Sequence, residues 1–253
     1  MSERRSAVIT GGATGIGFAT AVILNGEGFD LTIVGRRGDV LASAAEAIAT
    51  EGGGPPVAVQ AADLYEPDAA MRAVDAHVAH FGGIDALVAG AGSYEPVGLL
   101  ELTASAWDAT MNVHLRGAVL SASAAARHMT KAGHGRIVLI SSVNGFHSDP
   151  ESIHYNAAKT AIVSVARSLA VDLADTGVSA NAVAPGWVTT PMTADYLADA
   201  TPDRLRRVNP LGRAGRPDEI ARVIRFLILD APEFLTGSTI TIDGGQTAMA
   251  PMP

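Results

Sequence analysis

The sequence contains no cysteine, which excludes disulfide bonds, thiol nucleophiles and cysteine-ligated metal sites. Basic residues are few: 18 lysines and arginines face 26 acidic residues, and the net charge of −8 argues against a general affinity for nucleic acid or anionic membranes. No stretch has the ~20 consecutive apolar residues that cross a bilayer. The uncharged run from Ser6 to Gly26 is interrupted at its centre by Gly11, Gly12, Gly15 and Gly17. We therefore expect a cytoplasmic protein that binds neither nucleic acid nor membranes.

Recognisable metal and nucleophile motifs are missing too. His77 and His80 are three residues apart and His128 lies near His134, but neither pair has a third ligand within motif distance. The nucleophile pattern G-x-S-x-G does not occur. We expect no metal site and no serine-hydrolase chemistry.

The chain does contain a regular alternation of short apolar runs and longer segments with helical periodicity. The predicted strands are Ala7–Thr10, Leu31–Val34, Val57–Gln60, Ala86–Ala89, Arg136–Ser141, Val178–Ala184 and Thr239–Ile242. The predicted helices cover residues 16–27, 38–51, 67–81, 104–131, 153–174 and 217–229. Apolar strands separated by helices are typical of a parallel sheet covered on both faces. The pattern predicts one α/β domain over residues 1–253, with a doubly wound, Rossmann-type parallel sheet.

The region from Thr189 to Arg216 breaks this alternation. It contains several prolines and short helical pieces before the last predicted helix. We interpret it either as a lid over a substrate site or as a surface loop without a special role. The arginines of this region are expected to be surface charges that pair with neighbouring acidic residues. The alternative is that they bind an anionic substrate. These arginines are Arg204, Arg206, Arg207, Arg213 and Arg216.

A glycine-rich segment, Thr10 to Gly17, follows the first predicted strand and opens the first predicted helix. Glycine permits positive φ and lets a phosphate approach the backbone. The helix that follows offers free N–H groups and its positive end to a diphosphate. The strand–loop–helix context favours nucleotide binding over the alternative, a tight turn with packing glycines.

The end of the second predicted strand bears on the cofactor. An acidic residue there would accept from a free ribose 2′-OH, whereas an arginine would meet a 2′-phosphate. The chain has Gly35 at the acidic position, followed by Arg36 and Arg37. We therefore predict NADP(H) over NAD(H), with Arg36 as the main contact and Arg37 assisting. The alternative is two solvated arginines at a helix start.

A second cluster of polar residues points to proton transfer. Tyr155 and Lys159 are four residues apart on a predicted helix, so that the phenol and the ammonium share one face. We expect the cation to favour the phenolate and so to lower the pKa of the phenol, whose ordinary pKa is about 10. Ser142 follows the fifth predicted strand, where ligands of open α/β sheets bind. Asn112 lies in the middle of a predicted helix, where asparagine is unfavourable.

Together these residues resemble the short-chain dehydrogenase/reductase family. The resemblance runs from T-G-x-x-x-G-I-G at residues 10–17 to Asp243-Gly244-Gly245 and covers residues 6–246. It implies the family's tetrad of catalytic residues, here Asn112, Ser142, Tyr155 and Lys159. It further implies that Ser142, rather than Ser141, bonds the substrate oxygen, that Lys159 also holds the nicotinamide ribose, and that Asn112 holds a water linked to this lysine.

The resemblance also implies cofactor contacts. Asp63, beside Leu64, matches a position that accepts from the adenine amino group; the alternative is an N-cap for the helix expected from Pro67. Ala89-Gly90-Ala91-Gly92 stands where the family carries Asn-Asn-Ala-Gly, so backbone contacts to the ribose persist while two side-chain amides are lost. The segment Pro185-Gly186-Trp187-Val188-Thr189-Thr190 matches the family's P-G-x-x-x-T, in which Val188 and Thr190 would hold the carboxamide.

The activity implied is the interconversion of a small-molecule carbonyl and a secondary alcohol by a homotetramer paired through the helices near 104–131 and 153–174. The pattern is closest to 3-oxoacyl-thioester reductases, for which Lys131 and Arg136 are the candidate basic residues facing an acyl carrier protein. Alternatives are an NAD-dependent sugar, polyol or steroid dehydrogenase, and an NADP-binding regulator without catalysis. Candidate pocket residues flank the motifs: Ser93, Tyr94, Asn144, His147, His154, Trp187 and Met192.

Overall fold

Seven short apolar segments form one parallel sheet. The computed structural model of the protein describes residues 4–249. Its strands are β1 (Ser6–Thr10), β2 (Asp30–Gly35), β3 (Ala58–Ala61), β4 (Ala86–Ala89), β5 (Gly135–Ile140), β6 (Val178–Pro185) and β7 (Thr239–Ile242). Their order is β3-β2-β1-β4-β5-β6-β7, and all neighbours are parallel. β1, β4 and β6 are buried along their whole length, which agrees with their mainly apolar sequences.

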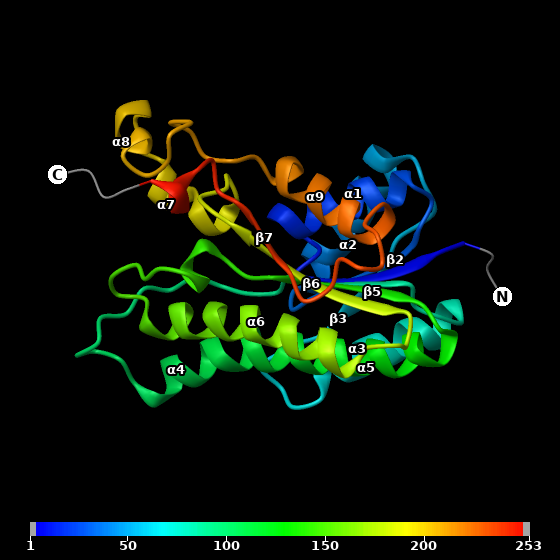
Figure 1. The fold of residues 1–253 in the computed structure, drawn as a ribbon. Coiled ribbons are helices and arrows are strands. Elements are labelled where there is room, and N and C mark those ends of the chain that lie inside the picture. The colour runs from blue at the N-terminus through cyan, green and yellow to red at the C-terminus, as the bar shows by residue number, and fades with distance from the viewer. Residues whose placement is uncertain (1–3, 250–253) are drawn as a thin grey trace.

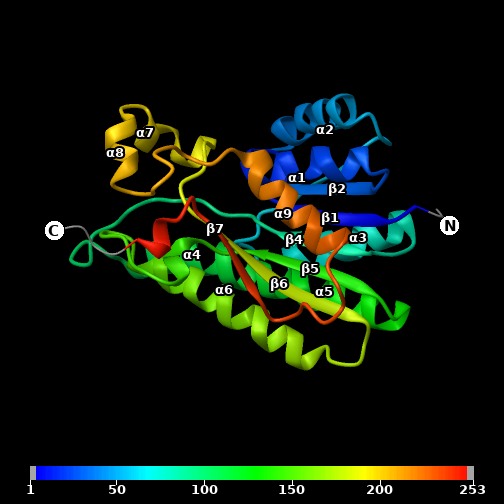
Figure 2. The ribbon, with the colours of Figure 1, turned by 45° about the horizontal axis from the view of Figure 1, so that its top comes forward.

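Helices cover both faces of this sheet (Figures 1 and 2). One layer holds α1 (Gly15–Gly26), α2 (Gly38–Gly52) and α9 (Pro217–Leu229); the other holds α3 (Ala69–Phe81), α4 (Ala104–Met111), α5 (Gly117–Ala132) and α6 (Ile153–Asp172). Each interface has its own apolar core, one around Ile9 and Leu31 and the other around Leu87 and Leu139. The predicted doubly wound α/β fold in a single domain is confirmed.

Two predicted helices differ from the structure. The helix expected over 67–81 begins at Ala69, because Asp68 before it adopts a left-handed φ of 59°. The helix expected over 104–131 is interrupted by a π-helical turn at Asn112–Arg116, in which the Gly117 N–H donates to the Asn112 carbonyl. Such a turn adds a residue to the local helical repeat and rotates the side chains around it.

The order of the strands reverses between β1 and β4. The chain proceeds from β1 outward through β2 and β3, then crosses to β4 on the other side of β1 and continues to β7. The connections that leave β1 and β4 therefore go to opposite faces and leave a crevice at the carboxyl ends of these strands, where ligands of open α/β sheets bind. Gly11 and Gly90, the residues directly after the two strands, lie at this crevice.

The irregular region after β6 lies beyond the carboxyl edge of the sheet (Figure 1). It contains a 3-10 turn at Pro191–Thr193 and the short helices α7 (Ala194–Leu197) and α8 (Pro202–Arg206). We call residues 189–216 the lid. Ion pairs account for three of its arginines, as predicted: Arg206 with Asp203, Arg213 with Glu219, and Arg216 with Asp218 and Glu219.

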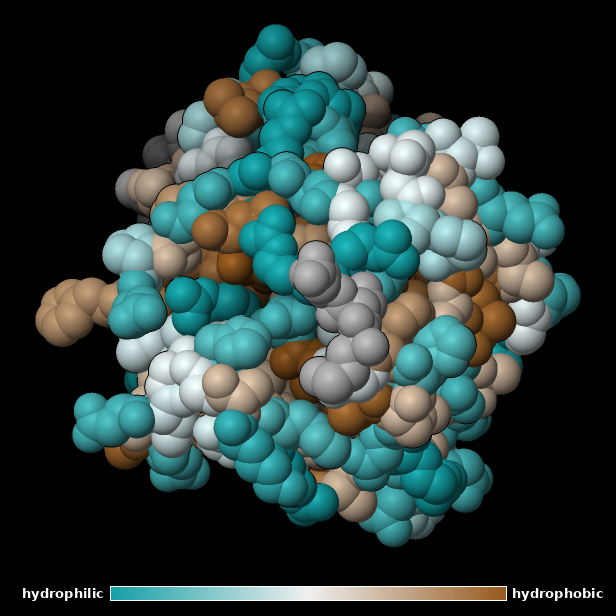
Figure 3. All heavy atoms as spheres, turned by 90° about the vertical axis from the view of Figure 1, so that its right-hand side faces the viewer, coloured by the Kyte–Doolittle hydropathy of each residue, from teal (hydrophilic) through white to brown (hydrophobic). Residues whose placement is uncertain are grey.

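The end of the molecule opposite the lid is mainly hydrophilic, with small apolar areas between (Figure 3). This is the amino edge of the sheet, where β5 begins. Lys131, near the end of α5, and Arg136, the second residue of β5, belong to this edge. The expectation that they border the active site is wrong, because Ser141 and Ser142 follow the opposite end of that strand. None of the helices between residues 4 and 249 has the length and hydrophobicity that crossing a bilayer requires.

Candidate active site

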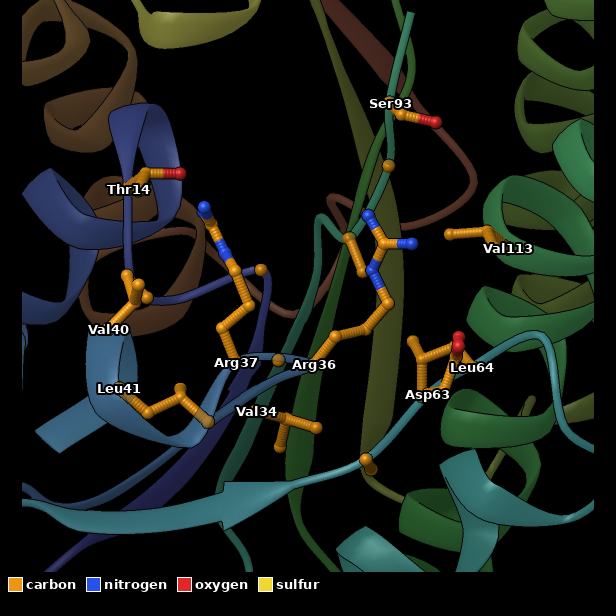
Figure 4. Close-up of a pocket in the computed structure, with 16 residues that line it drawn as sticks. Thr14, Val34, Arg36, Arg37, Val40, Leu41, Asp63, Leu64, Ser93 and Val113 are labelled. Carbon is orange, nitrogen blue, oxygen red and sulfur yellow. The ribbon is translucent and has the colours of Figure 1, made fainter.

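Two adjoining cavities follow the carboxyl edge of the sheet. The first is lined by the ends of β2 and β3 and by the glycine loop after β1 (Figure 4). The second, of about 180 Å³, continues from the same loop to Tyr155 and to the start of the lid. Gly11, Thr14 and Gly92 border both cavities, so the two form one extended trough.

Nearly all residues predicted to bind the cofactor line this trough. They are Gly11, Thr14, Gly15, Ile16, Gly17, Arg36, Arg37, Asp63, Leu64, Gly90, Ala91, Tyr155, Lys159, Pro185, Gly186, Val188 and Thr190. Ala89 is the exception, because it is the last residue of the buried strand β4 and does not border the trough.

At the centre of the trough, the backbone of the glycine loop after β1 packs directly against the backbone of the loop after β4. Gly11 has a φ of 73°, and a Cβ atom there would lie 2.8 Å from the Gly90 carbonyl oxygen. A Cβ atom on Gly17 would lie only 2.2 Å from the Gly11 carbonyl oxygen. Thr14 precedes α1 in extended conformation, and its side chain does not cap the helix. The first N–H groups of α1 therefore lack intrahelical acceptors and lie where a diphosphate can meet them.

Arg36 and Arg37 border the outer end of the trough. In Figure 4 both guanidinium groups extend into the cavity, Arg37 toward Thr14 and Arg36 toward Ser93 and Val113. Within residues 4–249, neither side chain has a hydrogen bond or an ion pair to another protein group. The two charges at this end of the trough are thus not neutralised by the protein.

Asp63 lies across the same cavity and is exposed. Its Oδ1 accepts a hydrogen bond from the Tyr65 N–H at 3.0 Å. The alternative role as a helix N-cap is wrong, because α3 begins at Ala69 and the residue in the cap position is Asp68.

The segment after β4 borders the crevice although it lacks the two side-chain amides of the family pattern. The Thr10 Oγ1 accepts from the backbone N–H groups of Gly90 (3.1 Å) and Ala91 (3.3 Å). A hydroxyl at the end of β1 therefore ties the loop after β4 to the floor of the crevice.

Tyr155 lies where the trough meets a third cavity under the lid. Its ring is flanked edge-to-face by Tyr94, at 5.0 Å between centroids, and by His114, at 5.3 Å. The Nζ of Lys159 lies 5.4 Å from the ring centre. Ser142 borders both cavities together with Tyr155, and its Oγ donates to the Asn144 Oδ1 at 3.3 Å.

Lys159 is buried, with 6% of its surface exposed. Its Nζ donates to the Ile140 carbonyl oxygen at 2.9 Å, and no acidic side chain within the described residues pairs with it. The neighbouring Ser141 has a structural role, because its Oγ donates to the Lys159 carbonyl oxygen at 2.8 Å and ties α6 to β5. Of the two serines, only Ser142 lines the cavity under the lid together with Tyr155.

Comparisons with known proteins agree with this geometry. A family model described as Enoyl-(Acyl carrier protein) reductase matches residues 11–247. The chain is 40% identical, over 97% of both chains, to the cis-4-hydroxycyclohexanecarboxylate dehydrogenase of Sinomonas cyclohexanicum, and 35% identical to the 3-oxoacyl-[acyl-carrier-protein] reductase FabG of Thermotoga maritima, over 96% of this chain and 98% of the relative. The crystal structure of acetoin dehydrogenase YohF from Salmonella typhimurium superposes with a TM-score of 0.89 at 31% identity and covers 99% of this chain and 98% of its own.

The chain belongs to the short-chain dehydrogenase/reductase family.

As a short-chain dehydrogenase/reductase, the protein is an oxidoreductase that acts on a carbonyl or an alcohol and uses a nicotinamide cofactor. The residues present fit such a cofactor. The trough is long, closely bounded by backbone at Gly11 and Gly17, and cationic at one end. At the other end the buried Nδ1 of His114 has no hydrogen-bond partner among residues 4–249.

Burial dominates the proton affinities at the centre of this short-chain dehydrogenase/reductase. Burial raises the pKa of Tyr155 to about 12, and the hydrogen bond from Ser142 opposes the rise only in part. Burial also lowers the pKa of Lys159 to about 8. The expectation that the cation would lower the tyrosine pKa is wrong for the protein alone, because burial disfavours the phenolate and Lys159 is not among the groups that lower this pKa. The phenol is a proton donor in this state.

The residue expected to complete the tetrad is not in the site. Asn112 is half-buried and borders neither the trough nor the cavity under the lid. His114, two residues later, is buried against Tyr155 and borders the trough with Ser142 and Lys159. Sequence reasoning missed His114, although a signal exists: Gly117, Ala118, Ser121 and Ala122 continue its face at helical spacing, and all four are buried.

The third cavity contains most of the predicted substrate-pocket residues. Tyr94, Asn144, Trp187 and Met192 line it together with Tyr155 and four side chains that were not predicted, those of Val143, Asp149, Thr193 and Tyr196. Ser93 borders the trough instead. His147 and His154 line none of the three cavities; His154 is buried with its Nε2 on the Glu95 carbonyl. Because Met192, Thr193 and Tyr196 belong to the lid, that region covers the pocket.

Proposed function

We propose that the protein is an NADP(H)-dependent carbonyl reductase or alcohol dehydrogenase, and that Arg36 and Arg37 determine the choice of cofactor. One observation carries the proposal: two unpaired guanidinium groups extend into the outer end of the trough (Figure 4), and Gly35 leaves no carboxylate for a ribose hydroxyl. A guanidinium matches a 2′-phosphate with two charge-assisted hydrogen bonds.

In this proposal the bound cofactor supplies or accepts a hydride, and the chain's own groups manage the proton. The Tyr155 hydroxyl gives its proton to the substrate oxygen during reduction and takes it back during oxidation. Ser142 holds the same oxygen by a hydrogen bond. Lys159 stabilises the tyrosinate that remains and also binds the nicotinamide ribose. All three groups border the cavity where the trough and the pocket meet.

We assign a neutral, ring-bearing ketone or secondary alcohol as the substrate class. The pocket is lined by the aromatic rings of Tyr94, Tyr196 and Trp187, whose neighbouring centroids are 5.6 and 5.8 Å apart. Its only charged side chain among the lining residues is Asp149, held by the Asn144 amide at 3.1 Å. An anionic group would therefore be repelled. The relative at 40% identity is named for a ring-bearing alcohol that also carries a carboxylate, and the present pocket lacks a cation for that group.

A 3-oxoacyl thioester is the second candidate. The 35% identity to the Thermotoga maritima 3-oxoacyl-[acyl-carrier-protein] reductase supports it, and the reacting end of such a substrate is neutral. Recognition of an acyl carrier protein through Lys131 and Arg136 is not part of this proposal, since both lie at the far edge of the sheet. A homotetramer paired through α5 and α6 remains part of it, and sedimentation velocity tests that assembly.

The test is a comparison of kcat/KM for NADPH and NADH with three substrates: cyclohexanone, 4-oxocyclohexanecarboxylate and acetoacetyl-CoA. We expect NADPH to be preferred by about a hundredfold or more, because a charge-assisted contact contributes ~3 kcal/mol to binding. We also expect cyclohexanone to be reduced faster than its carboxylated analogue. A preference for NADH overturns the cofactor assignment. Tight binding of NADPH without turnover of any substrate favours the silent regulator.

A further inference from the structure

The carboxylate of Asp149 borders the cavity under the lid with most of its acceptor capacity unused. A carboxylate can accept about four hydrogen bonds. Within residues 4–249, the Asp149 carboxylate accepts one, from the Asn144 amide to Oδ2 at 3.1 Å. Its Oδ1 lies 3.8 Å from the Nε2 of His147, which is beyond hydrogen-bond distance. Since the side chain is 34% exposed, a ligand in the cavity can reach the free lone pairs.

A network of buried amides holds this carboxylate in place. Asn144, which is 4% exposed, donates to Asp149 and also to the Asn156 Oδ1 at 2.7 Å. The Asn156 amide in turn donates to the Asp149 backbone carbonyl at 3.0 Å. The side chain and the backbone of Asp149 are therefore both fixed from the protein side. Such preorganisation lowers the entropy cost of binding a ligand.

The hydroxyl groups of Tyr94 and Thr193 border the same cavity and have their own hydrogens engaged elsewhere. The Ser152 Oγ donates to the Pro150 carbonyl at 3.0 Å. Because a hydroxyl has one hydrogen, the Tyr94 hydroxyl, at 2.8 Å, donates to Ser152 and does not accept from it. The Thr193 Oγ1 donates to the Val188 carbonyl. Toward a ligand, these two hydroxyl oxygens are therefore acceptors.

The remaining donors of the cavity do not serve Asp149. Tyr155 and Ser142 hold the reacting oxygen in the proposed function. The Trp187 N–H and the Tyr196 hydroxyl make no hydrogen bond to Asp149 in the part of the chain that the structure describes. Besides burial, the negative charge of Asp149 raises the pKa of Tyr155, so the carboxylate acts on the same space as the reacting phenol. The complement of Asp149 is a ligand group that donates a hydrogen bond.

A neutral hydroxyl suits this position better than an ammonium group. The four aromatic rings that line the cavity contact one another edge to face, with neighbouring centroids 5.0 to 5.8 Å apart. Ring edges thus occupy part of the π faces that a cation would use. An ammonium would also lose its water on entry, at a cost of several kcal/mol, while the charge of the part-exposed carboxylate is screened by solvent.

We propose that Asp149 determines specificity by accepting a hydrogen bond from a second hydroxyl group of the substrate. The substrate class is then a ring-bearing hydroxyketone, or the corresponding diol in the direction of oxidation. This inference rests on the proposed function and deepens it, since Tyr155 acts on one oxygen of the ring while Asp149 binds the hydrogen on another. The negative charge makes this hydrogen bond stronger than one between neutral groups.

Substrate pairs that differ in one hydrogen-bond donor test this role. 2-, 3- and 4-Hydroxycyclohexanone can donate to Asp149, whereas the matching methoxycyclohexanones can only accept. Asp149→Asn keeps the size of the side chain and its bond from Asn144, but it presents an NH2 group to the ligand. This group can donate to a methoxy oxygen. Since all these ketones are neutral, charge repulsion does not affect the comparison.

We expect the wild type to prefer at least one hydroxyketone over its methoxy partner. The ratio of their kcat/KM values should be about ten- to a hundredfold lower in Asp149→Asn, as for the loss of a hydrogen bond to a charged group. Asp172→Asn, at the far end of α6, is the matched control and should keep the wild-type ratio. Equal ratios in wild type and Asp149→Asn at all three ring positions overturn the proposal.

Two further measurements cover the other outcomes. Faster turnover of 4-(dimethylamino)cyclohexanone than of every hydroxyketone assigns the carboxylate to a cation and overturns the choice of a hydroxyl. Near-ultraviolet circular dichroism checks the fold of each variant. If Asp149→Asn does not fold, Asp149→Ser replaces it, because serine is too short to reach the same ligand group, and the ratio should fall in the same direction.

The proposed function can fail separately, through an absence of turnover in the wild type. The same ketones can then be titrated into the inactive NADPH complex and followed by saturation-transfer NMR. Tighter binding of a hydroxyketone than of its methoxy partner, lost in Asp149→Asn, supports the role of Asp149 without any catalysis. Equal binding of both partners at every ring position contradicts it.

Discussion

The Nζ of Lys159 lies 5.4 Å from the centre of the Tyr155 ring and donates its hydrogen bond to the Ile140 carbonyl, not to the phenol. The two groups are thus close without being bonded to each other. The phenol is flanked by the rings of Tyr94 and His114 and shares the cavity border with Ser142. Substitutions at these residues therefore test proton donation, charge and cofactor binding separately.

Tyr155→Phe should remove proton donation and little else. The phenylalanine ring keeps the edge-to-face contacts with Tyr94 and His114 but has no hydroxyl. We expect kcat to fall about a thousandfold, within the range of general acid catalysis, while the Kd for NADPH changes less than about twofold. Steady-state kinetics and fluorescence titration measure the two quantities. Retention of most activity would show that the proton comes from another group.

Lys159→Met tests how much the buried ammonium of Lys159 lowers the free energy of unfolding. The folded-state pKa is about 8, below the ordinary 10.5, so between these pH values the unfolded chain binds more protons than the folded one. The destabilisation is full below about pH 8 and lessens as the pH rises. Relative to Lys159→Met, the wild type should gain about 2 kcal/mol in free energy of unfolding from about pH 7 to about pH 9.5.

Urea unfolding of both proteins at the two pH values gives this difference directly. Groups common to wild type and variant cancel in the comparison. The stability that Tyr155 loses as the pH rises from its ordinary pKa of 10 toward about 12 falls almost entirely above the pH range used. A difference that is independent of pH would mean that Lys159 titrates in the folded protein as it does in water.

Arg36→Ala should weaken the use of NADPH selectively. Loss of a charge-assisted contact to a phosphate corresponds to about a ten- to hundredfold lower kcat/KM for NADPH, with little change for NADH. Arg37→Ala should have a smaller effect of the same kind. Arg72→Ala, which removes an exposed charge on α3, is the matched control. Equal losses with both cofactors would assign the arginines to general phosphate attraction.

Asp149→Asn should relax discrimination against anionic substrates. The amide can still accept from Asn144, so the pocket keeps its hydrogen bond and loses only its charge. We expect the ratio of kcat/KM for 4-oxocyclohexanecarboxylate to that for cyclohexanone to rise about fivefold, or ~1 kcal/mol of relieved repulsion. Asp172→Asn at the far end of α6 controls for net charge. An unchanged ratio would remove Asp149 from the determinants of specificity.

Local patterns in the sequence were enough to predict the sheet, the glycine loop and the Tyr155–Lys159 pair, because each depends on short-range spacing. The position of Asn112 was not predictable in the same way. The π-helical turn at Asn112–Arg116 changes which side chains face the sheet, and its effect becomes clear only when α5 is packed in place. Small residues at helical spacing after His114 indicate in the sequence that this side chain faces the core. We did not use this signal, because the family pattern led us to expect an asparagine.

The proton affinity of Tyr155 shows a second limit. The spacing of Tyr155 and Lys159 along the helix predicts that the ammonium lies near the phenol, and we therefore expected the pKa of Tyr155 to decrease. The actual increase arises from the desolvation of Tyr155, to which the lid, the loop after β4 and the π-helical turn at Asn112–Arg116 all contribute. These segments are distant in sequence, so the sign depends on tertiary structure.

The chain of aromatic contacts from Tyr155 through Tyr94 and Tyr196 ends at Trp187, at the border of the substrate pocket. Trp187 is one of only two tryptophans in the protein. Indole emission overlaps the absorption band of a reduced nicotinamide, and Trp187 follows directly on residues that line the trough. The protein therefore carries an intrinsic optical reporter at its reaction site, through which cofactor arrival can be timed without an added label.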